Sequence, residues 1–359
     1  MKIKLLSSFK SIENISEEWR DLLGKSRSNS IFLTWEWLYT WAEQFIKKGR
    51  ELFIIAVYHN EKLIGLAPWY INSFRFGPFN LRRIESLGTP ETASDYLDVI
   101  VEKGKEKMAA SKIYESLMGE LSFKWDCFHF RNSPSHSFFF LNFIQEFEND
   151  GKYIGVNKGA YCPILELCNT KEEFMASLSA NRRQQLRRHY KVLSNGGRVH
   201  HKKYTDEGAI DVINRFSKLY HKRWGSQGGD LFQFLEKFTH RTRGKNWVQI
   251  DLLQIDNNDI AGIFHLFYQR TANYYLMAVD KNFNPRISIG NILLSKCIQD
   301  AIENKLSKYD FLRGTEHHKF HWANHINSLQ NIEYYRCKIS TAALFAVESL
   351  RKMGKILLR

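Results

Sequence analysis

The chain contains one pattern of strands and turns twice. Residues 53–71 read FIIAVYHNEKLIGLAPWYI, and residues 248–268 read VQIDLLQIDNNDIAGIFHLFY. Each segment joins two short apolar runs through a polar turn, which is typical of a β-hairpin. Aligned on Gly65 and Gly262, the two hairpins match in turn position and in the apolar pair before each glycine. The sequence therefore predicts two related sheets.

The repeat continues beyond the hairpins. Each half has a stretch with helical spacing, KEKMAASKIYESLM in the first and GNILLSKCIQDAIENK in the second. A short strand follows, led by Asp126 in the first half and by Asp310 in the second. The first half has the longer loop between its hairpin and its helix. Because two copies are too few to stack as a solenoid, we interpret the chain as a tandem repeat of one module of helices and strands.

The second half has an order of elements that indicates the fold class. Thr170 and Glu173 form a capping box that is predicted to open a single helix, which ends at Asn195 before two glycines. The further predicted elements are a helix over 206–224, strands over 247–255, 260–268 and 273–280, a helix after Gly290 and a strand over 308–312. The last strand must return parallel after the crossover helix. The prediction is an α+β fold in which each lobe is a mostly antiparallel mixed sheet flanked by helices.

The length of 359 residues fits two domains. The segment NDGKYIGVNKGA at 149–160 is polar and glycine-bearing, as linkers are. We therefore predict an N-terminal lobe over 1–155, a C-terminal lobe over 156–336 and a basic amphipathic helix over 337–359.

Charge and cysteine content restrict the class of protein. The formal net charge of +14 favours a phosphate-bearing partner or an anionic membrane surface. The five cysteines include no CxxC pair, so disulfide, zinc and thiol redox chemistry are not indicated. The N-terminal apolar run is too short for a signal peptide, and no apolar stretch is long enough to cross a membrane. These features predict a cytoplasmic protein.

The segment 280–291 has the features of an anion-binding turn. A strand ends at Asp280, and Ser288, Gly290 and Asn291 open the next helix, with Arg286 just before it. The free N–H groups and the partial positive charge of a helix N-terminus attract phosphate groups. A helix start that needs a glycine and binds no ligand is the alternative.

The segment SIGNILLSKCIQDAIENKLSKYDFLRGTEHHKFHW resembles the closing motif of double-lobed members of the GNAT superfamily, namely the CelD-like acetyltransferases and their FemABX relatives. The residues that carry this motif are Asp310, Phe311, Gly314, Glu316, Lys319 and Trp322. With weaker similarities upstream, the resemblance extends from about Phe32 to Trp322. One departure is that Arg286 is followed by Gly290 alone, where the fuller pyrophosphate loop has two glycines.

The resemblance implies that acyl-CoA lies between the strand ending near Asp280 and the strand at 308–312. Its pyrophosphate would bind Arg286, Ser288, Gly290 and Asn291. The acceptor amine attacks the thioester carbonyl of acyl-CoA only in its neutral form, so a base must accept its proton. The negatively charged oxygen that forms on the carbonyl needs a hydrogen-bond donor. Glu316 and Asp310 are the candidate bases, and Lys319 is the candidate donor or phosphate ligand. Asp310 also has a structural interpretation, because the same aspartate recurs in the first half, and Glu316 with Lys319 has the alternative of a surface ion pair.

Further residues are candidates for contact with the acceptor or with phosphates. Arg182 and Arg187 belong to a helix with five clustered positive charges, for which a solvated basic face is the alternative. Arg223 beside Trp224 suits stacking on a flat group, although a buried indole is also typical. Asp95 and Asp98 belong to the long loop of the first half, where acids orient amines or cap turns. The spacing of the histidines in GTEHHKFHWANH does not favour a metal site.

The sequence leaves three functions open. The first is transfer of an acyl group, most simply acetyl, from acyl-CoA to an amine of a small molecule or of a sugar-linked or lipid-linked envelope or polysaccharide precursor. The second uses aminoacyl-tRNA as donor, as FemABX relatives do. The third is an idle module that binds phosphate, nucleic acid or membrane. The basic helix at 337–359 either docks on the second lobe or lies on an anionic membrane at the inner face.

Overall fold

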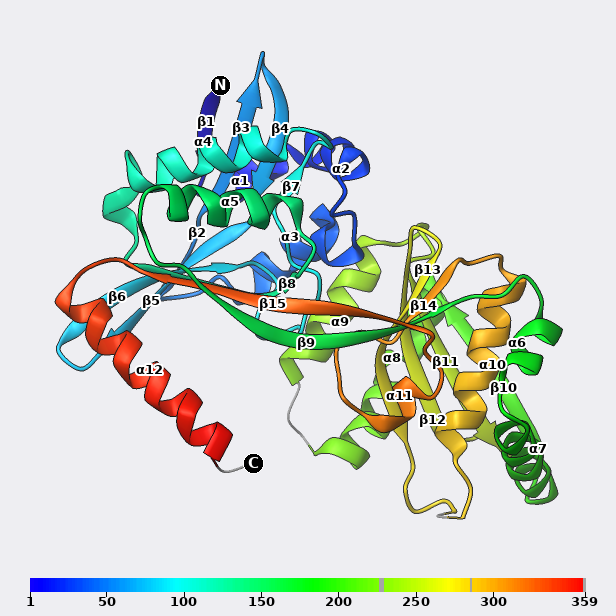
Figure 1. Ribbon diagram of the computed structural model, residues 1–359. Coiled ribbons are helices and arrows are strands. Elements are labelled where there is room, and N and C mark those ends of the chain that lie inside the picture. Colours follow the sequence, from blue (N-terminus) through cyan, green and yellow to red (C-terminus); the bar gives the residue numbers. More distant parts are fainter. Residues whose placement is uncertain (226–228, 285, 358–359) are drawn as a thin grey trace. The chain divides into compact units, whose positions relative to one another are not determined.

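In the computed structural model, residues 1–225, 229–284 and 286–357 are described, the last six of them as backbone only (Figure 1). Contacts divide the chain into two compact units. The first unit comprises Met1–Ala160 together with Ser328–Arg359, and the second comprises Tyr161–Asn327.

The first unit has two sheets and five principal helices along its N-terminal segment. Its strands are β1 (Lys2–Leu6), β2 (Arg50–Leu52), β3 (Ile54–His59), β4 (Lys62–Ala67), β5 (Trp69–Phe76), β6 (Phe79–Ser86), β7 (Ile100–Val101) and β8 (Cys127–Pro134). Its helices there are α1 (Phe9–Glu13), α2 (Ser16–Lys25), α3 (Trp35–Phe45), α4 (Glu106–Met118) and α5 (Phe138–Asn149). The end of the chain adds β15 (His325–Tyr335) and α12 (Ile339–Leu357).

The second unit begins along β9 (Gly155–Glu166). Its further strands are β10 (Val199–Thr205), β11 (Val248–Ile255), β12 (Asn258–Tyr268), β13 (Thr271–Val279) and β14 (Lys308–Asp310). Its helices are α6 (Lys171–Ser177), α7 (Ala180–Asn195), α8 (Asp206–Trp224), α9 (Gly229–Arg241), α10 (Ile289–Glu303) and α11 (His317–Phe320).

Strand pairing follows the same scheme in both units. In the second unit β10, β11, β12 and β13 pair antiparallel in sequence, β13 pairs parallel with β14 across the crossover helix α10, and β14 pairs antiparallel with β9. In the first unit β1, β3 and β4 pair antiparallel, as do β5 and β6, and β6 pairs parallel with β8, which α4 precedes. Strands β4 and β5 are separated only by Pro68 and correspond together to β12. The predicted α+β fold with tandem lobes is confirmed.

The last strand of the first unit comes from the far end of the chain. Strand β15 pairs antiparallel with β8, from Leu329 opposite Pro134 to Tyr335 opposite Cys127. Residues 328–336, which the sequence placed in the second lobe, therefore belong to the first unit, and α12 follows them there. The reason is that these residues satisfy the backbone hydrogen bonds of β8, a contact that no local pattern reveals.

Residues 170–195 form two helices, so the prediction of a single helix was wrong. Thr170 caps α6 by accepting from the Glu173 amide at 3.1 Å, as the capping box indicated. The helix stops at Ser177, and Ser179 caps α7 by accepting from the Arg182 amide at 3.3 Å. The Arg183 guanidinium donates to the carbonyl oxygens of the last turn of α6, including that of Ala176 at 3.0 Å. The break is stable because both new helix ends have hydrogen-bond partners.

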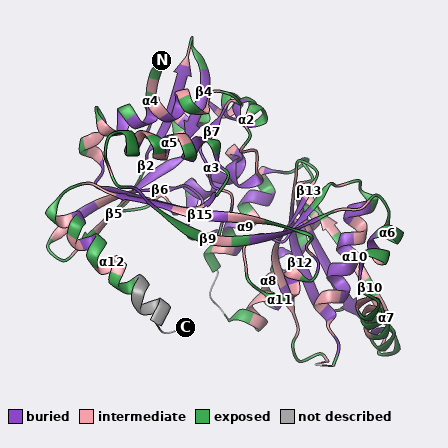
Figure 2. Ribbon diagram, in the orientation of Figure 1, coloured by how far each residue is buried: buried purple, intermediate pink, exposed green. Residues whose placement is uncertain are grey.

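Each unit buries its own apolar core (Figure 2). In the first unit the rings of Trp69, Phe128 and Phe130 pack between the strands and the helices α4 and α5. In the second unit α10 packs on the sheet through residues such as Leu293 and Ile298. Within the described part of the chain, none of the helices combines the length and the hydropathy that a bilayer crossing needs.

Candidate active site

A pocket of about 450 Å³ lies at the N-terminus of α10 in the second unit. Its lining comprises Arg223, Met277, Asp280, Lys281, Ser288, Gly290, Asn291 and His318. Three of the four residues predicted to bind the donor pyrophosphate, Ser288, Gly290 and Asn291, therefore line one cavity. The fourth, Arg286, is exposed on the preceding turn, where its amide donates to the Asn284 side chain at 3.0 Å.

The turn that forms this pocket is fixed at both ends. Strand β13 ends where the Asp280 amide donates to the Ile260 carbonyl at 2.8 Å. The Asp280 carboxylate then accepts from the Asn282 amide at 3.0 Å and from Lys222 at 2.7 Å. At the helix start, a Cβ on Gly290 would lie 2.6 Å from the Met277 methyl carbon. A side chain at position 290 would therefore displace the Met277 methyl group, and it would take up room in the pocket that both residues line.

Four buried nitrogen atoms near this pocket have no hydrogen-bond partner among the described residues. They are Arg182 Nε, Arg223 Nε, His318 Nε2 and Trp322 Nε1. The Arg182 guanidinium lies 4.1 Å from the centre of the Trp322 ring, and that of Arg223 lies 4.8 Å from the Trp224 ring. Partial burial of a cation without a counter-ion is unfavourable, so an anion bound here would stabilise the site.

The pKa shifts agree with an excess of positive charge. Burial lowers the pKa of Arg182. Burial also lowers the pKa of His318, and the charges of Lys319, Arg223 and Arg182 lower it further, against the opposing effect of Glu316. These groups are therefore close enough to act on one another electrostatically, and the imidazole of His318 is favoured in its neutral form.

The structure brings Glu316 and Lys319 together. Lys319 is only 5% exposed, and its ammonium lies 3.1 Å from the carboxylate of the exposed Glu316. It also donates to the Arg313 carbonyl at 2.8 Å. Gly314 has a φ of 148°, and a side chain there would overlap the Glu316 carboxylate. The loop after β14 thus holds an ammonium and a carboxylate beside His318, a lining residue of the pocket.

Asp310 has a structural contact of its own. It is buried at the end of β14, and its carboxylate accepts from the Leu312 amide at 2.8 Å. Leu312 has a φ of 53°, so the carboxylate stabilises an unusual turn. This contact is the one expected of the structural interpretation of Asp310.

Asp95 and Asp98 lie in the first unit and are both buried. The Asp98 carboxylate accepts from Ser28 at 2.6 Å, from Ser137 at 2.8 Å and from the Val99 amide at 2.8 Å. Burial raises its pKa to about 6, against the opposing effect of these hydrogen bonds. Asp98 thereby links the long loop to the N-terminus of α5, which is a structural role.

Helix α7 is mostly exposed, as Figure 2 shows. Arg182 turns toward Trp322, whereas Arg187 is exposed on the same helix. Trp224 is 56% exposed, and its indole nitrogen lies 3.5 Å from the Met277 carbonyl. Arg182 and Arg187, which the sequence predicted together as contacts for the acceptor or for phosphates, thus have different surroundings.

Sequence reasoning missed a buried polar chain under α10. Tyr309 lies 2.6 Å from His265, and His265 and His201 each lie 2.8 Å from the Asp251 carboxylate. Although burial disfavours its charged form, hydrogen bonds from the two histidines hold the pKa of Asp251 well below its usual range. The Cys297 thiol lies near His201 and Asp251, but burial raises its pKa. Because Asp251 already accepts several hydrogen bonds, we assign this cluster a structural role. His201, Asp251, His265 and Tyr309 lie on four different strands, so the local sequence gave no signal for this cluster.

Comparisons with known proteins identify the class of domain. Residues 180–320 match the family model described as an acetyltransferase (GNAT) domain. No curated protein sequence matches the chain. Among solved structures, FemX is 12% identical with a TM-score of 0.65, covering 97% of this chain and 99% of FemX.

Two further solved structures have the same fold. L-PGS from Bacillus licheniformis is 11% identical with a TM-score of 0.53, and the alignment covers 93% of this chain and 95% of that one. A tandem GNAT protein from the clavulanic acid biosynthesis pathway is 6% identical with a TM-score of 0.50, covering 92% and 98%. The second unit thus contains a GNAT domain, and the chain has the double-lobed fold of GNAT-superfamily acyltransferases. The narrower CelD-like assignment stays a prediction.

Proposed function

We propose that the protein is an N-acyltransferase that moves an acyl group, most simply acetyl, from acyl-CoA to an amine. The observation that carries this proposal is the pair of unpartnered guanidinium nitrogens of Arg182 and Arg223, together with the pocket at the N-terminus of α10. Helix N–H groups and guanidinium groups together suit the pyrophosphate of coenzyme A.

In this reaction the acceptor nitrogen attacks the thioester carbonyl, and the bond from carbon to sulfur breaks as the thiol of coenzyme A leaves. Glu316 accepts the proton of the amine, and Lys319 stabilises the oxyanion or a bound phosphate. We expect the amine on a small molecule or on a sugar-linked or lipid-linked precursor of the cell envelope, with the protein in the cytoplasm.

Calorimetry with acetyl-CoA tests the donor site. Arg223→Ala removes a cation that lines the pocket, and Gly290→Val adds a side chain against Met277. We expect Arg223→Ala to weaken binding about tenfold, because a hydrogen bond to a charged group contributes about 1.5 to 3 kcal/mol. We expect Gly290→Val to weaken binding as well, because its side chain would occupy part of the pocket. Arg187→Ala is the matched control, since Arg187 is exposed and does not line the pocket. Equal affinity in all four proteins would place the donor elsewhere.

Aminoacyl-tRNA is the second candidate donor, and one feature favours it. Residues 180–205 contain no Asp or Glu, while their basic residues are Arg182, Arg183, Arg187, Arg188, Lys191, Arg198, Lys202 and Lys203. An exposed surface of this kind attracts the phosphate backbone of nucleic acids. Two results together would select aminoacyl-tRNA as the donor. The protein would bind tRNA in a salt-dependent way that the Arg187→Glu, Arg188→Glu variant loses, and acetyl-CoA would give no heat of binding. Binding of acetyl-CoA without turnover on any amine would instead indicate an idle module.

A further inference from the structure

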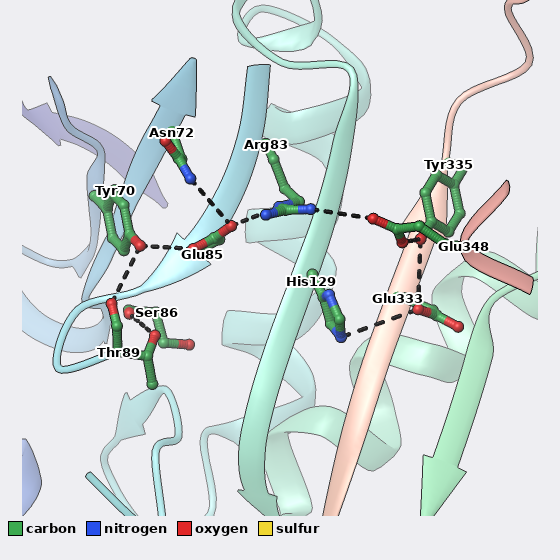
Figure 3. Close-up of polar contacts among 10 residues, drawn as sticks. All are labelled: Tyr70, Asn72, Arg83, Glu85, Ser86, Thr89, His129, Glu333, Tyr335 and Glu348. Carbon is green, nitrogen blue, oxygen red and sulfur yellow. Dashed lines mark hydrogen bonds and ion pairs between the residues drawn. The ribbon is translucent and has the colours of Figure 1, made fainter. Parts of the chain in front are cut away.

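The C-terminal helix α12 docks on the first unit along one face. Thr341 and Leu344 are buried, and Leu344 packs with Leu81 and Cys127. On the same face, the Glu348 carboxylate accepts from Tyr335 at 2.5 Å and from Arg83 at 3.4 Å (Figure 3). The docked face therefore contacts β6, β8 and β15 of the first unit, whereas the sequence had suggested docking on the second lobe.

Figure 3 shows that Glu348 belongs to a longer polar chain, which continues through Tyr335 to Glu333. Arg83 also donates to Glu85 at 2.5 Å, and Glu85 accepts from Tyr70 at 2.6 Å. Glu348 is the single acidic residue of α12. Because its charge is paired with Arg83 at the docked face, it does not contribute a negative charge to the outer face of the helix.

The opposite face of α12 is apolar and open to solvent. Ile339 is 84% exposed, Leu350 is 64% exposed, and Ala346 between them is also exposed. These positions, seven and eleven residues after Ile339, fall on one line of an α-helix, about half a turn away from Leu344 and Glu348. A helix with an exposed apolar line opposite its docked face has a second surface to cover.

Positive charge accompanies this apolar line. Arg351 is exposed, and the sequence adds Lys352, Lys355 and Arg359 at the end of the chain. With Glu348 turned inward, the solvent-exposed side of the helix has an apolar line flanked by Arg351, which lies about a third of a turn from that line. That combination is complementary to a bilayer that carries anionic head groups.

A groove of about 940 Å³ opens beside the first turns of α12. Tyr153, Tyr335 and Phe345 contribute rings to it, its cations are Lys152, Arg336 and Lys338, and Glu333 is the one acidic residue among the described residues that line it. Tyr153 is 80% exposed. Exposed aromatic rings beside lysine and arginine suit the boundary between head groups and acyl chains.

We propose that the outer face of α12, formed by Ile339, Ala346 and Leu350 and flanked by Arg351, binds the surface of an anionic phospholipid bilayer. A second copy of the chain is the less favoured occupant, because a second α12 would bring no unpaired acid to this face to pair with Arg351. The proposal uses a surface of the first unit and does not depend on acyl transfer.

Vesicle co-sedimentation of the full chain tests this surface. The probes are vesicles of phosphatidylglycerol and phosphatidylcholine in equal amounts, and vesicles of phosphatidylcholine alone. We expect binding to the anionic vesicles, and a loss of about tenfold in partitioning for Leu350→Asp, because a leucine that would enter the bilayer surface is replaced by a charge. Arg351→Glu should lose a similar factor and make the remaining binding less sensitive to salt.

Leu141→Asp is the matched control, since Leu141 is 68% exposed on α5 of the same unit and the change in charge is identical. Thermal melting of each variant checks its folding. The proposal fails if wild-type protein stays in solution with anionic vesicles, or if Leu141→Asp and Leu350→Asp lose binding equally. A concentration-dependent dimer that Leu350→Asp dissociates, without vesicle binding, would assign the face to a second copy of the chain.

Discussion

Lys319 is buried while its partner Glu316 remains exposed, and this asymmetry is the most informative feature at the residue scale. A buried ammonium keeps its charge only with close partners, which here are Glu316 and the Arg313 carbonyl. An exposed carboxylate beside it can exchange protons with a substrate. The pair therefore differs from a surface ion pair, in which both charged groups are exposed.

Glu316→Gln should lower kcat by about a hundredfold to ten-thousandfold, because it removes a base while keeping the shape of the side chain. Acyl-CoA affinity should stay near that of the wild type. Lys319→Met keeps the volume of the buried stem and should also lower kcat. Steady-state rates with an identified amine acceptor measure both. Wild-type turnover in Glu316→Gln would remove it as the base and return Asp310 to consideration.

Asp98 gives a prediction for pH dependence. Its pKa is raised to about 6 in the folded protein from 3.8, so folding favours the protonated carboxyl. The stabilisation by this group is therefore complete below about pH 4 and is lost as the pH rises through 6, by about 3 kcal/mol in total. Asp98→Asn should remove this dependence. In thermal melts between pH 4 and 8, the wild type should lose stability relative to Asp98→Asn as the pH rises, and a constant difference between the two proteins would contradict the assignment.

At the scale of elements, the break between α6 and α7 decides what the basic helix can do. The apolar positions Phe174, Leu178 and Leu186 have a spacing that runs through the break, so sequence periodicity predicts one helix. Ser179 ends it by capping the next helix. The new helix turns Arg182 toward Trp322 and leaves most of its other basic residues in solvent.

The repeat also holds for the order of helices and strands, but not for the packing of corresponding residues. A Cβ on Gly65 would contact Ala109 of α4, whereas one on Gly262 would contact Phe216 of α8. Since α4 and α10 are the corresponding crossover helices, the two glycines face different helices. The resemblance between the hairpins therefore predicted strand order correctly but not which face each residue occupies.

At the scale of the whole molecule, the first unit is completed by a strand from the far end of the chain. Strand β15 pairs with β8, whereas the paired residues of β9 and β14 both belong to the continuous second unit, Tyr161–Asn327. The N-terminal half of the sequence therefore cannot form its complete sheet by itself, although it contains the meander, helix and strand of one lobe.

Two truncations test this arrangement. A chain ending at Lys338 loses α12 but keeps β15, and we expect it to melt cooperatively with a modest loss of stability. A chain ending at Asn327 also loses β15, which leaves β8 unpaired on one side, and we expect the first unit to unfold or aggregate. Circular dichroism and hydrogen exchange would follow each unit. Equal stability of the two truncated chains would contradict the role assigned to β15.

The sequence by itself determined the tandem α+β repeat, the strand order, the helix over 206–224 and the turn around Gly290, because hairpins, caps and helix starts depend on residues that are neighbours in the chain. It also indicated Arg182, Arg223 and Lys319 through a family resemblance. Only the tertiary structure decided that residues 328–336 complete the first unit, that α12 docks there through Glu348, and that His318 joins the pocket. Those outcomes depend on contacts between residues far apart in sequence, for which local patterns carry no signal.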